Sequence, residues 1–182
     1  MCNNTIGSFI DPRDKKVYKT VRIGTQTWLA ENLKYKTSGS RCYKDNSDNC
    51  SKYGRLYDWD TAMKVAPPGW HLPTQDEWEV LLNVAGGFLI RGTHLKATSG
   101  WKPYKGQPCN GIDKYDFAAL PGGLCNSAGT FRNAGSSGCW WSADTNNIIS
   151  DNAYYQYMNS TSNVYPNSSS KDHLYSVRCV MN

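Results

Sequence analysis

The chain has 182 residues, which is enough for one domain with a sizeable core. Aromatic residues make up 13% of it, and together with many Gly, Ser, Asn and Thr residues they are typical of short strands joined by long loops. The formal charge of +5 is modest. The basic residues near the start of the chain are interpreted as a solvated face: Lys15, Lys16, Lys19 and Arg22. No nucleic-acid partner is therefore expected.

Seven cysteines in a chain of this size favour an oxidising, extracytoplasmic compartment. No segment has the pattern of a signal peptide or a membrane-spanning helix. Cys2 has two interpretations that stay open: the lipidated first residue of a mature lipoprotein, which would be the only membrane anchor expected, or an incidental cysteine in a frayed tail. In order of preference, the expected disulfides are Cys42–Cys50 across a polar loop, Cys125–Cys139 across a glycine-rich loop and, by elimination, Cys109–Cys179.

The chain begins with a predicted tail and a hairpin. Residues 1–15 are assigned to an N-terminal tail, and residues 16–182 to a single domain without an internal repeat or a linker. Strands 17–23 and 26–29 are predicted on either side of a turn at Gly24 and Thr25.

Two helices are expected next. A polar, loop-like stretch over 32–51 precedes Leu56, Trp59 and Met63, which recur at helical spacing and predict a helix over 53–64. A pair of prolines ends this helix.

The second helix has the clearest boundaries in the chain. Thr74 is a good N-cap, and Glu77 three residues later completes a capping box. Apolar residues then recur at helical spacing until Gly86, which predicts a helix over 75–85. A short strand over 70–72 leads into it.

The C-terminal half consists of predicted strands and long loops. Residues 86–111 are expected to be loop, with one helical or irregular turn around His94, Leu95 and Lys96. Two helices followed by a strand-and-loop half indicate an α+β fold. The predicted strands are 117–120, 140–143, 153–158 and 175–180.

No set of residues has the pattern of a catalytic or metal site. His71, His94 and His173 are scattered and belong to no zinc-binding motif. The loop 45–49 has oxygen ligands but lacks the glycine and the distal glutamate of an EF-hand. No nucleophile motif or phosphate-binding glycine loop occurs. We therefore expect no catalytic residue, no metal and no cofactor.

The segment 144–173 has the most unusual composition. It is rich in Asn, Ser, Tyr and Asp, the residues that antibody paratopes use for adaptable contacts. A plain polar loop between two strands is the alternative, since loops are usually polar. The strand 153–158 presents Tyr154 and Gln156 on one face and Tyr155 on the other, and which face meets solvent stays open. The predicted ligand-facing residues are Asn147, Asn152, Tyr154, Gln156, Asn159 and Asn163.

Several long motifs follow one another along nearly the whole chain. They are VRIGTQTWLAENL at 21–33, GRLYDW at 54–59, GWHLPTQDEW at 69–78, LKATSGW at 95–101, FAALPGG at 117–123, WWS at 140–142 and YSVRCV at 175–180. In this order they resemble one bacterial family, the Fibrobacter succinogenes major paralogous domain family.

The resemblance implies a C-type-lectin-like fold in secreted or surface-anchored bacterial proteins, without an established activity. The pattern is also similar to formylglycine-generating enzymes and to the variable proteins of diversity-generating retroelements. Those enzymes use two closely spaced cysteines near the C-terminal end, where this chain has only Cys179. Many relatives carry a cysteine where this chain has Ala66, which places the partner of Cys179 in question. The sugar-binding triplets of calcium-dependent lectins are absent.

The sequence therefore predicts a non-enzymatic, disulfide-supported binding module at the bacterial cell surface or secreted. Its partner would be a glycan or a protein, bound through the C-terminal Asn/Tyr/Ser-rich face, and retroelement-driven mutagenesis would explain that composition. The alternatives are a structural surface lipoprotein without a specific ligand and an enzyme of the formylglycine-generating type.

Overall fold

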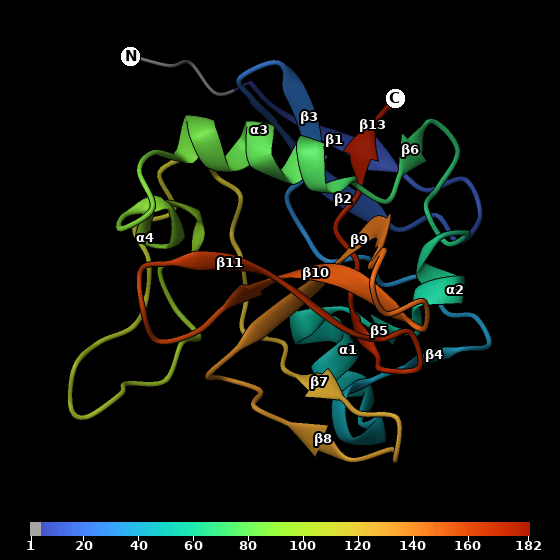
Figure 1. Cartoon of the computed structure of the whole chain (residues 1–182). Helices are drawn as coiled ribbons and strands as arrows, with labels where there is room; N and C mark the ends of the chain where they lie inside the picture. The colour runs from blue at the N-terminus through green and yellow to red at the C-terminus, as the bar shows by residue number, and fades with distance from the viewer. Residues whose placement is uncertain (1–4) are drawn as a thin grey trace.

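The fold is α+β, as predicted, and consists mainly of short strands (Figure 1). The computed structural model describes residues 5–182, so Cys2, the candidate lipid-attachment residue, lies outside the described residues. No helix in that range is long and apolar enough to cross a membrane. Two larger sheets and one small one carry the described strands.

The first sheet brings the two ends of the described chain together, in the order β1-β2-β3-β13-β6. The predicted hairpin is confirmed as β2 (Val17–Ile23) and β3 (Gln26–Leu29). β1 (Ile6–Ile10) pairs antiparallel with β2, so part of the stretch assigned to an N-terminal tail is an edge strand. The remaining strands are β13 (Val180–Met181) and β6 (Trp70–His71).

The second sheet has the order β11-β10-β9-β12-β5-β4. β9 (Gly138–Thr145) and β10 (Asn152–Met158) confirm two predicted strands, whereas β11 (Val164–Ser170) lies in a stretch expected to be loop. The shorter strands are β12 (Tyr175–Ser176), β5 (Leu56–Tyr57) and β4 (Ser40–Arg41), and the small separate sheet contains β7 (Leu124–Cys125) and β8 (Phe131–Arg132).

The predicted last strand, 175–180, is divided between the two larger sheets, because Arg178 enters the core. Its guanidinium is fully buried and donates to the carbonyl oxygens of Leu29 (3.2 Å) and Phe117 (2.5 Å). It also donates to Asn32 Oδ1 at 3.0 Å. Burial lowers the pKa of Arg178 to about 10. The chain thus crosses from one sheet to the other at a cation that two segments, 29–32 and 117–118, surround with acceptors.

The predicted helix over 53–64 is wrong. α1 (Ser47–Tyr53) ends at Gly54, which has a φ of 79° and lies so close to Asn32 that a Cβ there would be 2.7 Å from the Asn32 Cβ. After β5, Asp58 caps a separate short helix, α2 (Trp59–Ala62). Close backbone packing and a second N-cap therefore override the apolar spacing.

The predicted helix over 75–85 is confirmed as α3 (Gln75–Ala85), including its capping box of Thr74 and Glu77. Its buried residues recur on one face. The helical turn expected near His94 is α4 (Arg91–Leu95). The remaining short helix is the 3-10 turn η1 (Tyr43–Asp45).

Residues 117–120 are buried but do not form the predicted strand. Ala118 has a φ of 51°, which is incompatible with an extended ladder. Only an isolated bridge joins Ala119 to Lys96. The apolar run is explained by packing, since Phe117 contacts Trp28 and Trp78 in the core.

The core has two clusters, and β9 separates them. Trp140 belongs to the cluster around Trp28 and Trp78, whereas its neighbour Trp141 belongs to the cluster around Tyr175. Adjacent strand residues point to opposite faces, so both faces of β9 are covered. The strands next to β9 are therefore attached to a rigid central strand.

One of the three predicted disulfides is formed. Cys42 and Cys50 are bonded, with their Cα atoms 4.9 Å apart. Cys109, Cys125, Cys139 and Cys179 are free and buried, so the other two pairings were wrong. Gly123 bridges Gly138 in parallel, which puts Cys125 and Cys139 one residue out of register and on opposite faces. Cys109 and Cys179 belong to different core clusters.

Candidate functional site

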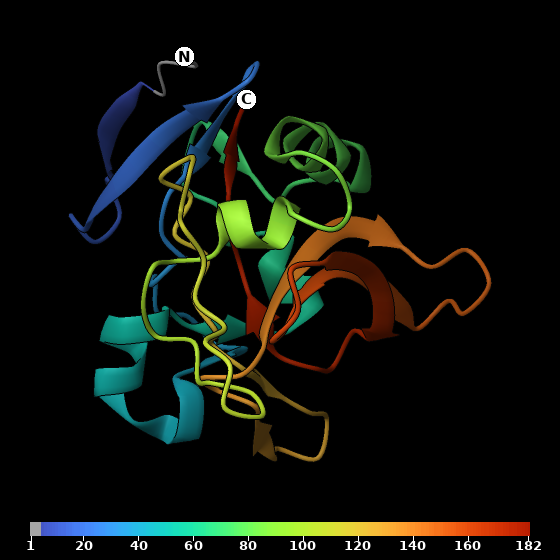
Figure 2. The same ribbon diagram turned by 90° about the vertical axis from the view of Figure 1, so that its left-hand side faces the viewer.

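The candidate site is the ribbon of β9, β10 and β11, which contains most of the unusual segment 144–173. β10 pairs antiparallel with β11 along its whole length, from Asn152 opposite Ser170 to Met158 opposite Val164. The sequence of β11 does not show the alternation of apolar and polar residues that indicates a strand, because it contains Pro166 and a run of polar residues after it. The turn between β9 and β10 projects from the body of the molecule (Figure 2, orange, right).

A bulge in β9 connects this ribbon to α3. Ala153 pairs with Thr145 but Tyr155 pairs with Trp141, so three residues of β9 lie opposite Tyr154. The bulge is fixed by Asp144 Oδ2, which accepts from the backbone N–H of Gln75 at 2.5 Å. The backbone N–H of Ala143 also donates to the Pro73 carbonyl at 2.9 Å. The edge of the ribbon is therefore anchored at the start of a helix.

The inner face of β10 is the one that carries Gln156. Gln156 is only 2% exposed, and its Nε2 donates to Gln75 Oε1 at 2.9 Å. Its Oε1 has no hydrogen-bond partner among the described residues. Met158 on the same face is fully buried. The prediction that Gln156 faces a ligand is wrong, because α3 covers this part of the strand.

The opposite face of β10 is a half-buried aromatic cluster. Tyr155 stacks against Tyr175 with ring centroids 4.5 Å apart, and Trp141 lies 4.4 Å from Tyr175. Burial raises the pKa of Tyr155 to about 12, so its hydroxyl stays neutral at physiological pH. The hydroxyl of Tyr175 forms a hydrogen bond with the Ser169 hydroxyl, at 2.9 Å between the two oxygen atoms. This face is committed to packing.

Two of the predicted ligand residues, Asn159 and Asn163, belong to the turn between β10 and β11. Asn159 Oδ1 accepts from both the N–H and the hydroxyl of Thr161 at 2.9 Å. Asn163 Nδ2 donates to the Tyr165 hydroxyl at 2.8 Å. These amides therefore already have partners inside the loop.

The same turn is docked on α4. The N–H of Gly92 donates to the Ser162 carbonyl at 2.7 Å, and Lys96 Nζ donates to the Thr161 carbonyl at 2.6 Å. Lys96 is 2% exposed and lies over Trp101, and burial lowers its pKa to about 8. We call this turn, residues 159–163, the anchored end of β10.

The other three predicted residues, Asn147, Asn152 and Tyr154, are at the opposite end of β10. Their side chains make no hydrogen bond within the described part of the chain. Asn147 is exposed, and Asn152 and Tyr154 are half-buried. Beside them, Ile148 is 92% exposed and Ile149 is 52% exposed. We call these residues, 147–149 with Asn152 and Tyr154, the open end of β10.

The backbone of the open end is nevertheless fixed. Asn146 Oδ1 accepts from the N–H groups of Ile148 (2.8 Å) and Ile149 (3.0 Å). Asn146 Nδ2 donates to Ser168 Oγ on β11 at 2.9 Å, and Lys171 Nζ donates to the Ser150 carbonyl at 2.8 Å. Sequence reasoning missed Asn146, although an Asx-turn residue at a strand end was a usable signal.

The predicted ligand set is thus divided. Asn152 and Asn159 are at opposite ends of β10, roughly 20 Å apart at the rise of an extended strand. They do not converge on one small ligand. Among the six predicted residues, Asn147, Asn152 and Tyr154 at the open end have side chains that make no hydrogen bond within residues 5–182.

The His, Cys, Asp and Glu residues of the described range are not grouped as metal ligands. No group of three His, Cys, Asp or Glu residues in the described range has a metal-binding arrangement. His71 lies between Glu77 and Asn182, each 2.7 Å from a ring nitrogen, and serves the start of α3. Burial raises the pKa of Cys179 to about 12, which leaves its thiol protonated and unreactive at neutral pH.

Comparison with known proteins identifies one family. The family model described as the Fibrobacter succinogenes major domain matches residues 21–181. No curated protein and no solved structure matches the chain. The match begins within β2, so it leaves out β1 and includes every strand of the second sheet.

Proposed function

The chain belongs to the Fibrobacter succinogenes major domain family, and on this premise we propose that it is a non-enzymatic ligand-binding module at the exterior of a bacterial cell. The partner is a glycan or a protein, and the contact surface is the open end of β10. The scaffold is C-type-lectin-like, an assignment supported by the family resemblance. The Cys42–Cys50 bond supports an oxidising environment.

One observation carries this proposal: the open end combines side chains without internal partners with a backbone that is held in place. A binding surface gains affinity when it is ordered before the partner arrives, because less conformational entropy is lost on binding. Tyr154 offers a rigid aromatic surface, while Asn147 and Asn152 offer adaptable hydrogen bonds. Ile148 and Ile149 add exposed apolar area, which favours a protein partner over a glycan.

The structural alternative has its own supporting observation. Asn159 Oδ1 bonds Thr161 within the turn and Asn163 Nδ2 bonds Tyr165 on β11, so an Asn- and Ser-rich composition can serve local structure alone. A module without a specific ligand would use the whole segment in this way. The enzyme alternative is disfavoured, since all four described free cysteines are buried.

Two parts of the proposal concern the origin of the protein. Retroelement-driven diversification predicts a near-copy of the coding stretch for 144–173 in the source genome, differing at adenines. Lipidation predicts a modified Cys2, which mass spectrometry of the native protein would detect. An unmodified Cys2 would remove the anchor but leave the binding proposal intact.

The direct experiment is an array of glycans and host proteins probed with the purified protein, with and without a calcium chelator. We expect selective binding that survives chelation. Binding lost on chelation would mean that a metal site contributes to recognition. If the protein binds none of the glycans and proteins on the array, the structural alternative is favoured.

A further inference from the structure

A basic groove lies beside the disulfide, away from the ribbon of β9, β10 and β11 in the sequence. Its volume is about 520 Å³, within the range of small-ligand pockets. It is formed by the turn before β2, the segment after β3, and the region from β4 through α1 to Arg55. Its charged lining residues are Lys16, Lys34, Lys36, Arg41 and Arg55, with Asp45 as the only carboxylate among them.

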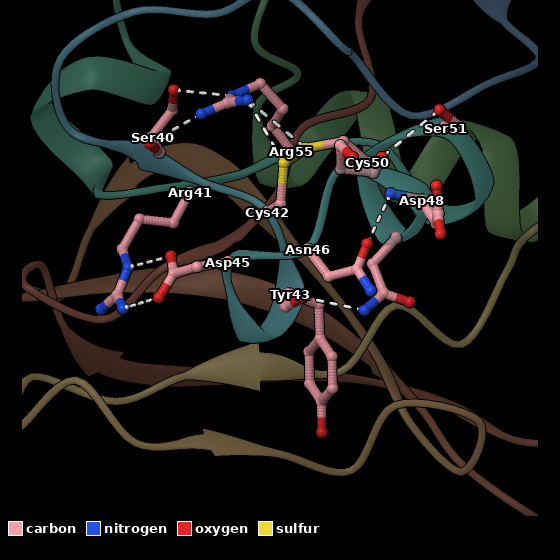
Figure 3. Close-up of a disulfide and its surroundings, with 12 residues drawn as sticks. Ser40, Arg41, Cys42, Tyr43, Asp45, Asn46, Asp48, Cys50, Ser51 and Arg55 are labelled. Atoms are coloured by element: carbon pink, nitrogen blue, oxygen red, sulfur yellow. Dashed lines mark hydrogen bonds and ion pairs between the residues drawn. A yellow bond between two sulfur atoms is a disulfide. The ribbon is translucent and has the colours of Figure 1, made fainter.

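Three of these cations are neutralised by neighbouring carboxylates. Lys16 pairs with Asp14 at 2.5 Å, and Lys34 pairs with Glu31 at 2.8 Å. Arg41 pairs with Asp45 at 2.5 Å (Figure 3). The groove is therefore less basic than the count of its lysines and arginines suggests.

The other two cations, Lys36 and Arg55, have no carboxylate partner within the described residues. Figure 3 shows how Arg55 is fixed: its Nε and Nη2 donate to Ser40 Oγ and to the Ser40 carbonyl, both at 2.9 Å. Its Nη1 lies 3.4 Å from the sulfur atoms of both Cys42 and Cys50. Disulfide sulfurs are weak acceptors and carry no charge, so the guanidinium stays uncompensated.

Arg55 is thus a cation held in a fixed position, and its guanidinium has more N–H groups than Ser40 has oxygen acceptors for them. A guanidinium has five N–H groups, and Ser40 supplies only two oxygen acceptors. An anion is the partner that would neutralise such a group, and the planar fork of arginine suits a carboxylate or a sulfate. Lys36 adds a second, mobile charge to the same groove.

The uncharged lining residues restrict the ligand further. They are the hydroxyl residues Ser40, Ser47 and Ser51 and the two disulfide cysteines, and no aliphatic or aromatic side chain contributes. The lining contains no aromatic ring on which a nucleobase could stack. Serine hydroxyls donate to and accept from sugar hydroxyls.

From these contacts we infer that the groove beside the Cys42–Cys50 disulfide is an anion-binding site for an acidic saccharide. The carboxylate or sulfate group contacts Arg55 and Lys36, and the serines contact the sugar hydroxyls. This site is independent of the open end of β10. The molecule then has a second binding surface, which selects for charge rather than for shape.

The test is isothermal titration calorimetry of the full chain with digalacturonate, a sulfated disaccharide, neutral cellobiose and inorganic sulfate. We expect binding of one or both acidic saccharides, no binding of cellobiose, and weaker binding of sulfate alone. Raising the salt from 20 to 200 mM should weaken the interaction, since exposed charges are screened. Digalacturonate and the sulfated disaccharide distinguish the two anionic groups.

Variants locate the site. Arg55→Gln should weaken binding about tenfold, as expected for loss of a hydrogen bond to a charged group. Lys36→Gln, which leaves the fold untouched, should weaken it about threefold. Lys105→Gln, an exposed lysine outside the groove, should leave affinity unchanged. Absence of acidic-saccharide binding, equal affinity for sulfate alone, or an unchanged affinity in both groove variants would overturn the inference.

Discussion

The two ends of β10 carry similar residues and differ in what those residues do. At the anchored end, Asn159 and Asn163 bond inside a turn that is docked on α4. At the open end, the side chains of Asn147 and Asn152 make no hydrogen bond within the described chain, although Asn146 holds their turn in place. Composition alone therefore does not distinguish structural from recognition residues, because the neighbouring element decides which amides are already satisfied.

The largest expected effect is a loss of stability at the anchored end. In Gly92→Ala the new methyl group would overlap the carbonyl of Ser162, so the turn must move away from α4. We expect the free energy of unfolding to fall by about 1–3 kcal/mol, the usual range for overpacking. Urea denaturation measures it. Gly87→Ala is the matched control, since no atom lies within 4 Å of its Cβ position; a comparable loss there would contradict the assignment.

The second effect concerns the pH dependence that Lys96 gives to the anchored end. Burial lowers its folded-state pKa to about 8, below the unfolded value of about 10.5, so the unfolded chain binds the proton more tightly between these values. Lys96 should therefore add stability as the pH rises from 8 to 9.5, on the order of 1 kcal/mol after allowance for solvent screening. Burial raises the pKa of the Cys139 and Cys179 thiols, which act in the opposite direction above about pH 9, so the effect of Lys96 is read from a comparison with a variant that lacks it. Above pH 10 the raised pKa of Tyr155 acts in the opposite direction.

Urea denaturation midpoints at pH 7.5, 8.5 and 9.5 measure this slope. Lys96→Met keeps the packing against Trp101 and removes the titrating group, so its stability should rise less, or fall more, with pH than that of the unchanged protein. An identical slope in both proteins would show that Lys96 is not the group responsible.

The smallest effects compare single amides at the two ends. Asn163→Ala removes the hydrogen bond to Tyr165 and should cost about 0.5–1 kcal/mol of stability. Asn147→Ala removes no internal bond and should change stability by less than about 0.5 kcal/mol. Thermal denaturation of the two variants under the same conditions decides the comparison. A larger loss for Asn147→Ala would reverse the roles of the two ends.

Local signals in the sequence predicted the elements that depend on local chemistry. The capping box of Thr74 and Glu77 and the terminal Gly86 define α3, and its bounds were predicted correctly. The β2–β3 hairpin was predicted for the same reason, since its turn and alternation lie within a few residues. No long-range information is needed for either element.

The errors arose where distant parts of the chain determine the structure. Gly54 ends α1 because the backbone near Asn32 lies against it, and Arg178 divides the last strand because acceptors from two distant segments converge there. The buried position of Gln156 depends on where α3 lies. The difference between the two ends of β10 has the same origin, since only the turn at Asn159–Asn163 is docked on α4.

The most direct test of the account compares binding by two matched variants on the glycan and host-protein array. One variant, Asn147→Ala/Asn152→Ala/Tyr154→Ala, removes the side chains of the open end, and the other, Asn159→Ala/Asn163→Ala, removes amides of the anchored end. The account predicts that the first variant folds normally but loses the selective signal, whereas the second retains it. Retention of the signal by the first variant, or its loss only in the second, would contradict recognition through the open end of β10.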